Sequence, residues 1–406
     1  MLIRYTSKFW RWFNIDVTIV IPVKNGEDSL EILFQKIFLQ KTKLKYEVIV
    51  VDSGSKDKSK EIIKKYSEVK LYEIKPEEFN HGLTRNFGAS KGTGEYIIFL
   101  TQDAIPASEF WLDNLVSACK LKENIAGGFG RHLPYPDCNI FDKRDLFFHF
   151  ENFGKNTIFQ KIDDKERYKK DIVYKQWLSF FSDNNSCLKR EIWEKIPYDN
   201  VKFAEDQIWA RKIIEAGYTK VYVPYAPVYH SHNYDLKEYL KRYYDEFKGL
   251  YSIYNYGYID SKFLVYLYTV KSFVNDREYL KSLLLNKKEK FKWLKYSLIR
   301  NYNKYLGAYL ATKYLKSDNN TKNKLDEKFS QQKRQIESWY YMMIFKILKV
   351  YKNEGLKGLK VRLKNRIRTQ KEVKLQQTNI NKFYEFIETS IENQKEDFNL
   401  SNTNII

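Results

Sequence analysis

The sequence predicts an α/β protein with a doubly wound, mostly parallel sheet, followed by a mainly α-helical and basic C-terminal region. In the first half of the chain, short apolar runs typical of buried parallel strands alternate with helical segments. Beyond residue 236 there is no proline and little glycine, and aromatic residues interleave with lysines at helical spacing. These two observations define the fold class.

Four apolar runs form the strands of the predicted sheet, and they cover residues 17–23, 46–51, 69–74 and 96–100. Apolar residues at helical spacing predict helices between them, the first over 30–38, the second around Ile62 and Ile63, and the third over 82–90. Strand–helix alternation at this spacing predicts right-handed crossovers and therefore parallel strands.

Charge is distributed unevenly along the chain. Residues 237–406 hold 35 Lys and Arg against 18 Asp and Glu, a net charge of +17, whereas the first 236 residues hold 36 against 33, a net charge of +3. A basic helical half rich in aromatic residues can bind an anionic membrane surface or nucleic acid. Because no nucleic-acid-binding signature occurs, we expect the membrane surface as the partner and not nucleic acid.

The sequence predicts no membrane span, since no run of about eighteen uncharged apolar residues occurs. The N-terminus lacks the apolar core of a secretory signal. Residues 357–368 carry an apolar stripe beside six basic residues, which suits an anionic bilayer surface, although a helix could also pack such a stripe on the protein's own core. Three widely spaced cysteines indicate a reducing compartment. We expect a cytoplasmic protein, peripheral on the inner face of the cytoplasmic membrane.

An aspartate follows the fourth predicted strand, in the sequence Thr101-Gln102-Asp103-Ala104. Open α/β sheets bind ligands at the carboxyl ends of their strands. A carboxylate there is an oxygen ligand suited to Mg²⁺ or Mn²⁺ bridging a diphosphate. The alternative is that Asp103 caps a helix that Pro106 and Ser108 could start.

A second aspartate, Asp52, ends the second predicted strand. It could accept hydrogen bonds from a nucleobase or a ribose hydroxyl, or it could form a turn beside Gly54. The sequence contains neither G-x-G-x-x-G after the first strand nor a Walker-type G-K-[ST]. This argues against a dinucleotide-dependent dehydrogenase and a P-loop enzyme.

Several separate motifs resemble the nucleotide-sugar-binding half of family 2 glycosyltransferases, which have the GT-A fold. They comprise residues 20–25, 50–57 and 99–104. Four further motifs are similar to the rhamnosyltransferase-like branch of that family, at residues 79–86, 130–134, 203–207 and 229–234. The resemblance covers about residues 16–250. Thr101 stands where the family commonly has the first Asp of Asp-x-Asp, so only one carboxylate remains.

The resemblance implies a set of residues that bind the nucleotide sugar: Pro22, Val23, Asn25, Asp52, Ser53, Arg85, Gln102 and Asp103. It also implies that Asp206 is the general base of an inverting displacement and that Glu205 orients the acceptor or Asp206. A carboxylate at a helix N-terminus is normally stabilised as the anion, which a base must be. For Arg85, the alternative to a diphosphate contact is a surface arginine on a helix.

His230 and His232 follow an extended run, where residues i and i+2 share a face, so both imidazoles could point into one site. Together with Asp103 they are the predicted ligands of Mg²⁺ or Mn²⁺, and the family pattern favours His230. A zinc site made by this pair is not expected, because no further His or Cys lies at usable spacing.

The predicted function is that of an inverting glycosyltransferase. It would move a sugar, rhamnose being one option, from a nucleoside-diphosphate donor to a hydroxyl of a lipid-linked or growing bacterial surface polysaccharide, such as O-antigen or capsule. The alternatives are a hexosyl- or N-acetylhexosaminyltransferase of the same fold, a non-catalytic scaffold of that fold, and a nucleic-acid-binding protein.

The predicted organisation has six parts. They are an N-terminal extension (1–15), the GT-A catalytic domain (16–236), a helical region packed on it (237–317), a linker (318–332), a basic amphipathic helical segment (333–389) and a disordered tail (390–406).

Overall fold

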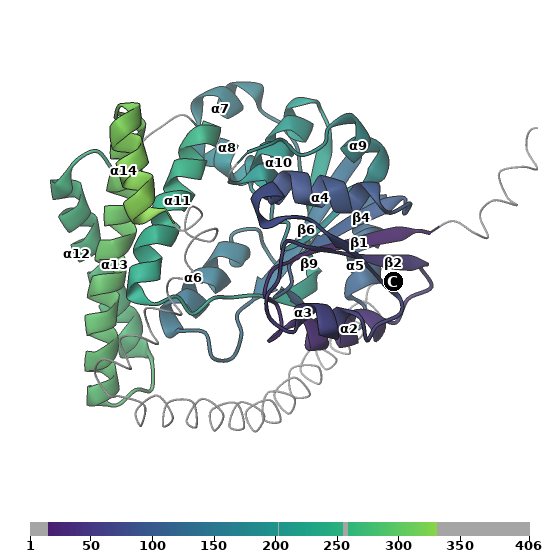
Figure 1. Cartoon of the computed structure of the whole chain (residues 1–406). Coiled ribbons are helices and arrows are strands. Elements are labelled where there is room, and N and C mark those ends of the chain that lie inside the picture. Colours follow the sequence, from purple (N-terminus) through teal and green to yellow (C-terminus); the bar gives the residue numbers. More distant parts are fainter. Residues whose placement is uncertain (1–14, 202, 255–258, 331–406) are drawn as a thin grey trace, which may run out of the picture. The chain divides into compact units, whose positions relative to one another are not determined.

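The computed structural model describes residues 15–201, 203–254 and 259–330 (Figure 1). The predicted N-terminal extension, apart from Ile15, lies outside these residues. The predicted amphipathic segment 333–389 and the tail 390–406 also lie outside them.

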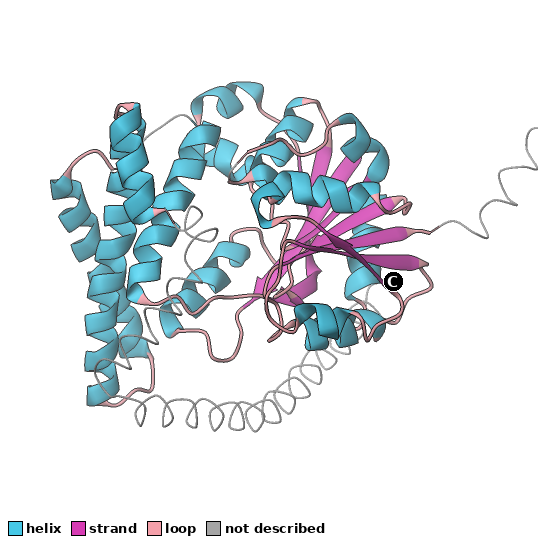
Figure 2. Ribbon diagram, in the orientation of Figure 1, coloured by secondary structure: helices cyan, strands magenta, loops and turns pink. Residues whose placement is uncertain are grey.

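Within the described residues, a nine-stranded sheet forms the centre of the first half (Figure 2). Its strands are β1 (Val17–Val23), β2 (Tyr46–Asp52), β3 (Val69–Glu73), β4 (Tyr96–Leu100), β5 (Ile105–Pro106), β6 (Ile125–Leu133), β7 (Ile158–Gln160), β8 (Asn185–Lys189) and β9 (Thr219–Tyr229). The order is β3-β2-β1-β4-β8-β6-β9-β5, and β7 also pairs with β9. The four predicted strands are all present and parallel to one another.

The helices of the first half are α2 (Leu30–Phe38), α3 (Ser59–Ile63), α4 (His81–Ser90), α5 (Trp111–Lys120), α6 (Ile140–Glu151), α7 (Lys165–Lys170), α8 (Ile172–Ser179), α9 (Arg190–Lys195) and α10 (Glu205–Glu215), and a 3₁₀ turn spans Pro76–Glu78. Helices α4, α9 and α10 cover one face of the sheet, and α2, α3 and α5 lie on the other (Figure 1). The predicted α/β class is confirmed.

The core between α4 and the sheet is tightly packed. Val20, Ile97 and Phe99 of the sheet are buried in one cluster with Trp209 of α10. Gly88 lets α4 approach closely, since a Cβ there would lie 2.4 Å from a methyl group of Val20. Burial of continuous apolar strands on both faces is what a covered parallel sheet requires.

Strand β8 runs antiparallel to β4, and this reversal positions the site. The register pairs Leu100, the last residue of β4, with Asn185, the first residue of β8. The residues just before β8 therefore lie at the same edge of the sheet as the residues just after β4. Asp103 follows that edge, and the segment 230–232 follows the end of β9, which is parallel to β6.

The second half consists of helices α11 (Leu236–Tyr254), α12 (Lys262–Ser282), α13 (Lys287–Leu315) and α14 (Asn319–Phe329). Gly307 of α13 allows close packing on α11, because a Cβ there would lie 3.0 Å from the Leu240 carbonyl oxygen. The predicted helical C-terminal region is confirmed. None of the helices in the described ranges is long and apolar enough to cross a bilayer.

The predicted linker, residues 318–332, is wrong, because α14 occupies most of it. The polar run that suggested a linker is a helix start: Asp318 accepts a hydrogen bond from the Thr321 amide at 2.8 Å. Asp326 of α14 then forms an ion pair with Lys248 of α11, at 2.5 Å, and accepts a hydrogen bond from Tyr244.

The three cysteines of the chain are free thiols and are buried: Cys119, Cys138 and Cys187.

Candidate active site

The loop after β1 is fastened to the loop after β2. The Asn25 amide donates to Ser55 Oγ at 2.8 Å, and the Lys56 amide donates back to Asn25 Oδ1 at 2.8 Å. Asn25 has a left-handed backbone with φ 52°, which asparagine tolerates better than most residues. The two loops thus form one preorganised rim at the carboxyl ends of β1 and β2.

Asp52 lies fully buried beneath this rim. Its Oδ1 accepts hydrogen bonds from the amides of Gly54 and Ser55, both at 2.9 Å, which is the turn-forming role considered above. Its Oδ2 is buried and has no hydrogen-bond partner among the described residues. A buried acceptor without a partner is costly, so Oδ2 is the atom available to a ligand donor.

The other predicted residues of this rim are part of the backbone framework. Pro22 and Val23 end β1, and Ser53 Oγ donates to the Val23 carbonyl at 3.1 Å. Gln102 clamps the next loop: its Oε1 accepts from the Lys24 amide at 2.8 Å, and its Nε2 donates to the Lys24 carbonyl at 3.1 Å. Both ends of the Gln102 amide are therefore bonded to the Lys24 backbone, and its contact with the donor stays a prediction.

Asp103, His230 and His232 meet at the edge of the sheet. His230 Nε2 lies 3.7 Å from Asp103 Oδ1, and His232 Nδ1 lies 3.8 Å from Asp103 Oδ2. One ligand atom from each residue falls within 4.8 Å of the others. The helix-cap alternative for Asp103 fails, because Pro106 belongs to β5 and the next helix begins only at Trp111.

The electrostatics of this group suit a cation. Burial lowers the pKa of His230 to about 4, although Asp103 opposes the shift, and burial also lowers the pKa of His232. Burial raises the pKa of Asp103, but the two histidines and a hydrogen bond outweigh it and lower the pKa overall. Two neutral imidazoles and an ionised carboxylate are ligands in the protonation states that a divalent metal needs. The three residues therefore fit a metal ion.

A second group, here called the carboxylate cluster, lies where α10 begins and consists of Arg85, Asp183, Glu205 and Asp206. Arg85 is 4% exposed. It donates to Glu205 Oε1 at 2.7 Å, and its Nε lies 3.5 Å from Asp183 Oδ2. Asp206 Oδ1 accepts from the Gln207 amide at 2.8 Å. The cluster therefore has one guanidinium, paired with Glu205 and Asp183, for three carboxyl groups.

This imbalance of charge raises the pKa values of two carboxyl groups. Burial, followed by the negative charges of Glu205 and Asp183, raises the pKa of Asp206 well above its ordinary range. Burial raises the pKa of Asp183 to about 6, even though Arg85 opposes the shift. The expectation that the helix N-terminus simply stabilises the Asp206 anion is therefore incomplete, because its neighbours disfavour the anion.

The residue before the carboxylate pair is strained. Ala204 has φ 58° and ψ 37°, the left-handed conformation that an L-residue with a Cβ seldom adopts. Such conformations persist where the surrounding structure over-determines them, often at functional sites. The strained turn at Ala204 aims Glu205 toward the Arg85 guanidinium and places Asp206 beside Asp183.

The comparisons with known proteins bear on this geometry. A family model described as glycosyl transferase family 2 matches residues 18–197. The O-antigen chain rhamnosyltransferase RfbN of Salmonella typhimurium is 33% identical over 235 residues, which cover 56% of this chain and 70% of that protein. The chain belongs to glycosyltransferase family 2. A second relative, the O-antigen chain rhamnosyltransferase WbaN of Salmonella anatum, is 31% identical over 56% of this chain and 70% of that protein.

Among solved structures, S. aureus TarS 1–349 has 14% identity and a TM-score of 0.43, covering 74% of this chain and 91% of that one. The mannosyltransferase PcManGT from Pyrobaculum calidifontis, in complex with GDP-Man and Mn²⁺, has 16% identity and a TM-score of 0.43, covering 78% and 79%. This glycosyltransferase has the α/β GT-A fold, and the prediction of a glycosyltransferase is confirmed.

Donor binding by Arg85 stays a prediction, and the structure adds protein partners for this side chain. A residue that binds diphosphate must present its side chain to it. In this structure the Arg85 side chain is buried and donates to Glu205 and to the His81 carbonyl. The alternative of a surface arginine is wrong because of this burial. In this glycosyltransferase Arg85 holds the carboxylate cluster together.

Sequence reasoning missed Asp183, Asn184 and Tyr198. The Asp183 amide lies 3.4 Å from Asp206 Oδ2, while the Asn184 amide nitrogen lies 3.4 Å from His230 Nδ1. Tyr198 donates to Asp183 Oδ1 at 2.8 Å. Asp183 and Asn184 are here called the 183–184 turn, and they connect the carboxylate cluster to the Asp103–histidine group. The signal in the sequence was the polar run Asp183-Asn184-Asn185 at the start of a strand. It points to the site only when β8 is known to run antiparallel to β4, because the start of β8 then lies beside the end of β4.

Proposed function

We propose that this enzyme transfers a deoxyhexose, with rhamnose as the first candidate, from a nucleoside diphosphate to a hydroxyl of a lipid-linked bacterial surface polysaccharide, with inversion at the anomeric carbon. The two O-antigen rhamnosyltransferase relatives support this sugar and this acceptor. The observation that carries the proposal is the 183–184 turn, which puts a base candidate and a metal-ligand group at one edge of the sheet.

Asp206 is the proposed base. The proton of the acceptor hydroxyl passes to the Asp206 carboxylate as the acceptor oxygen bonds to the anomeric carbon and the bond from that carbon to the diphosphate breaks. A carboxylate with a raised pKa is a stronger base than an ordinary one. Glu205, held by Arg85 at 2.7 Å, keeps the negative charge beside Asp206 that raises its pKa.

Asp103, His230 and His232 would hold the divalent cation, which neutralises charge on the departing diphosphate when bound. Two imidazole nitrogens and one carboxylate suit Mn²⁺ better than Mg²⁺, because Mg²⁺ strongly prefers oxygen ligands. The Asn184 side-chain nitrogen lies 3.4 Å from His230 Nδ1, so this side chain helps to orient the His230 ring.

The nucleoside is the proposed ligand of the rim after β1 and β2. Asp52 Oδ2 has the unused acceptor capacity for an imide N–H of a pyrimidine or for a ribose hydroxyl. Asn25 and Ser53 shape the loops that would enclose it. The buried position of Oδ2 requires a small opening of this rim when the donor binds.

A donor screen tests the function. Hydrolysis of nucleotide sugars is measured with Mn²⁺, with Mg²⁺ and with chelator, across deoxythymidine-, uridine- and guanosine-linked sugars. We expect the highest rate with a deoxythymidine-diphosphate-linked deoxyhexose and Mn²⁺. Preferred turnover of a uridine-linked N-acetylhexosamine would overturn the sugar assignment, and no turnover of any nucleotide sugar, with or without acceptor, would overturn the function.

We also propose that the enzyme works peripherally at the inner face of the cytoplasmic membrane. Residues 262–316 hold 13 Lys and Arg against 3 Asp and Glu. Along α12, a row of apolar side chains faces solvent at helical spacing, with exposed fractions of 46–72%: Phe263, Tyr266, Leu267, Val270 and Val274. An apolar helix face within a basic region matches an anionic bilayer.

A further inference from the structure

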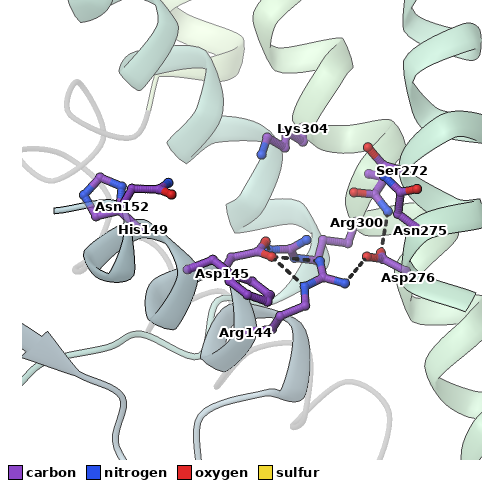
Figure 3. A pocket seen from close by; sticks show the side chains of 11 residues that line it. Arg144, Asp145, His149, Asn152, Ser272, Asn275, Asp276, Arg300 and Lys304 are labelled. Carbon is purple, nitrogen blue, oxygen red and sulfur yellow. Dashed lines mark hydrogen bonds and ion pairs between the residues drawn. The ribbon is translucent and has the colours of Figure 1, made fainter. Parts of the chain in front are cut away.

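A polar pocket lies between α6 and the helices α12 and α13 (Figure 3). None of its lining residues belongs to the carboxylate cluster or to the Asp103–histidine group, which together are here called the strand-end site. Its volume is about 350 Å³, toward the small end of ligand pockets. His149 and Asn152 line one side, Asn275 lines the opposite side, and Lys304 projects toward the space between them (Figure 3). Nothing in the proposed chemistry uses these residues.

The floor of the pocket is a paired ionic network. Arg300 is 2% exposed and bonds Asp142 at 2.5 Å and Asp145 at 2.8 Å. Arg144 bonds Asp276 at 2.7 Å and Asp145 at 2.7 Å. Because these charges satisfy one another, the floor is rigid and offers little attraction to a further ion.

The rim of the pocket has unused hydrogen-bonding capacity. The side-chain amides of Asn152 and Asn275 are exposed and make no hydrogen bond within the described parts of the chain. Lys304 forms no ion pair among the described residues, and its ammonium lies over the Tyr243 ring at 5.2 Å. The exposed ring of Phe148 adds an apolar surface beside them.

This combination selects one class of ligand. Free amides present both donors and acceptors, and a single lysine adds donors. Aromatic rings pack against the C–H faces of a pyranose. A hydroxyl-rich, uncharged ligand satisfies such a rim, whereas a strongly anionic ligand would meet only one unpaired cation. The pocket is therefore matched to a saccharide.

The pocket is connected to the strand-end site through α6. At the start of α6, the Asn139 amide donates to Asn233, one residue beyond His232, at 3.1 Å. Further along, rings follow one another from His230 to His132 (5.3 Å), from His132 to Phe150 (4.8 Å), and from Phe150 to His149 (5.0 Å). These rings include the buried His132 and Phe150, so the pocket wall and the histidine group are joined through the packed interior along α6.

We propose that the pocket between α6, α12 and α13 binds a saccharide unit of the acceptor, away from the hydroxyl that reacts. This inference rests on the proposed function, because it takes the acceptor to be a glycan. The pocket would make the enzyme select acceptors that already carry several sugars, while leaving the chemistry at Asp206 unchanged.

The test uses the full chain with Asn152→Ala and Asn275→Ala combined, and separately with Lys304→Met. The matched controls are Asn320→Ala on α14 and Lys313→Met on α13, both exposed. Binding to an array of bacterial surface oligosaccharides is measured without donor, and affinities for the best ligand are compared with those for its terminal monosaccharide. KM for both acceptors follows in the transfer assay.

We expect the double variant to weaken oligosaccharide binding and raise the oligosaccharide KM about tenfold or more, with kcat, donor hydrolysis and monosaccharide KM unchanged. The controls should behave as the parent. Binding of inorganic phosphate that Lys304→Met abolishes, without saccharide binding, would overturn the inference in favour of an anion site. Unchanged oligosaccharide binding in the double variant, or no glycan binding by the parent, would also overturn it.

These outcomes are distinguishable from failure of the proposed function. If the parent turns over no nucleotide sugar but the pocket variants lose glycan binding, the function fails and the saccharide site stands. If the parent transfers sugar and the variants match it on long and short acceptors, the function stands and the saccharide site fails.

Discussion

The carboxylate cluster in the α/β half and the ionic network under the helical pocket are both built from arginines and carboxylates, but they shift carboxyl pKa values in opposite directions. In the cluster, the buried Arg85 forms ion pairs with Asp183 and Glu205, and Asp206 lies beside them without a cation of its own in contact among the described residues. In the helical network, Arg144 and Arg300 share three aspartates, Asp142, Asp145 and Asp276. The ratio of cations to carboxylates is what separates the two.

That ratio sets the protonation chemistry. In the cluster, burial and the excess of negative charge raise the pKa of Asp206. In the helical network, burial also raises the pKa of Asp145, but Arg300 and Arg144 outweigh it and the pKa falls below its ordinary value. A carboxylate short of cations holds its proton readily and can act as a base, whereas one surrounded by cations is a fixed structural charge.

The largest expected effect comes from removing the base. Asp206→Asn keeps the shape of the side chain but loses its basicity, so transfer should fall by about 10²- to 10⁴-fold. Donor affinity, measured by calorimetry, should stay within a few fold of the parent. The matched control is Asp199→Asn, a surface carboxylate paired with Lys212 at 2.6 Å. If Asp206→Asn transfers sugar within tenfold of the parent, Asp206 is not the base.

Removing the shared cation should affect stability more in the cluster than in the helical network. Arg85→Gln leaves buried carboxylates unpaired and should cost about 3–5 kcal/mol of unfolding free energy. Arg300→Gln should cost less, because Arg144 still pairs with Asp145 and Asp276. Urea unfolding of both variants measures the difference.

The loss in Arg85→Gln should also depend on pH. Because the folded protein holds the pKa values of Asp183 and Asp206 above their unfolded values, it binds more protons than the unfolded chain. Stability should therefore recover as the pH falls from 8 toward 6. Equal losses for the two arginine variants, with no recovery at low pH, would contradict the difference drawn between the networks.

The metal ligands come next in expected size. Asp103→Ala should abolish Mn²⁺-dependent donor binding, whereas His232→Ala should raise the Mn²⁺ concentration for half-maximal binding by about 10- to 100-fold. The expectation follows from the position of His232 Nδ1, which lies 3.8 Å from Asp103 Oδ2. Titration of Mn²⁺, followed by its electron paramagnetic resonance signal in the presence of nucleoside diphosphate, measures this directly. Activity that survives chelation, combined with a mild effect of Asp103→Ala, would show a metal-free site.

A smaller change should appear in the pH profile. Transfer needs ionised Asp206, so the rate should fall as the pH drops through its raised pKa. Asp183→Asn removes a neighbouring negative charge while leaving an oxygen for the Tyr198 hydroxyl. The acid limb of kcat should then move down by roughly one pH unit. An unmoved limb would indicate that Asp183 does not influence the base, and the surface variant Asp199→Asn controls for general charge effects.

Local patterns were enough to predict most of the α/β half. Both ends of the strand 96–100 were predicted correctly, because polar residues bound its five buried residues on either side. Asp103, His230 and His232 were also predicted, since parallel strands bring their carboxyl ends to one edge and alternate residues share a face.

What the sequence could not supply was the direction of β8 and the partners of buried charges. Asp183 joins the site only because β8 runs antiparallel to β4. The sequence also does not show that two buried carboxylates, Asp183 and Glu205, lie beside the Arg85 guanidinium. The linker prediction failed likewise, since Asp318 caps a helix whose packing depends on Lys248, seventy residues away.

The smallest effects concern membrane docking, where two surfaces compete. The basic segment 333–389 lies outside the described residues, whereas the exposed face of α12 lies within them. Cutting the chain after Ser330 keeps α14 and its contact with Lys248, and removes the segment together with the tail 390–406. Replacing Phe263 and Val270 by serine keeps the chain but removes two of the exposed apolar side chains of α12.

We expect both changes to weaken sedimentation with anionic vesicles and to leave donor hydrolysis unchanged. Each basic residue near an anionic leaflet contributes about 1 kcal/mol, and salt screens this attraction. Binding of the truncated chain should therefore depend less on salt than binding of the full chain. The α12 variant should lose binding that high salt does not already remove, because apolar burial is not screened. Lys313→Met is the control for a single lost charge. If the truncated chain binds as the full chain does and the α12 variant does not, docking belongs to α12, on the same helix that lines the proposed saccharide pocket.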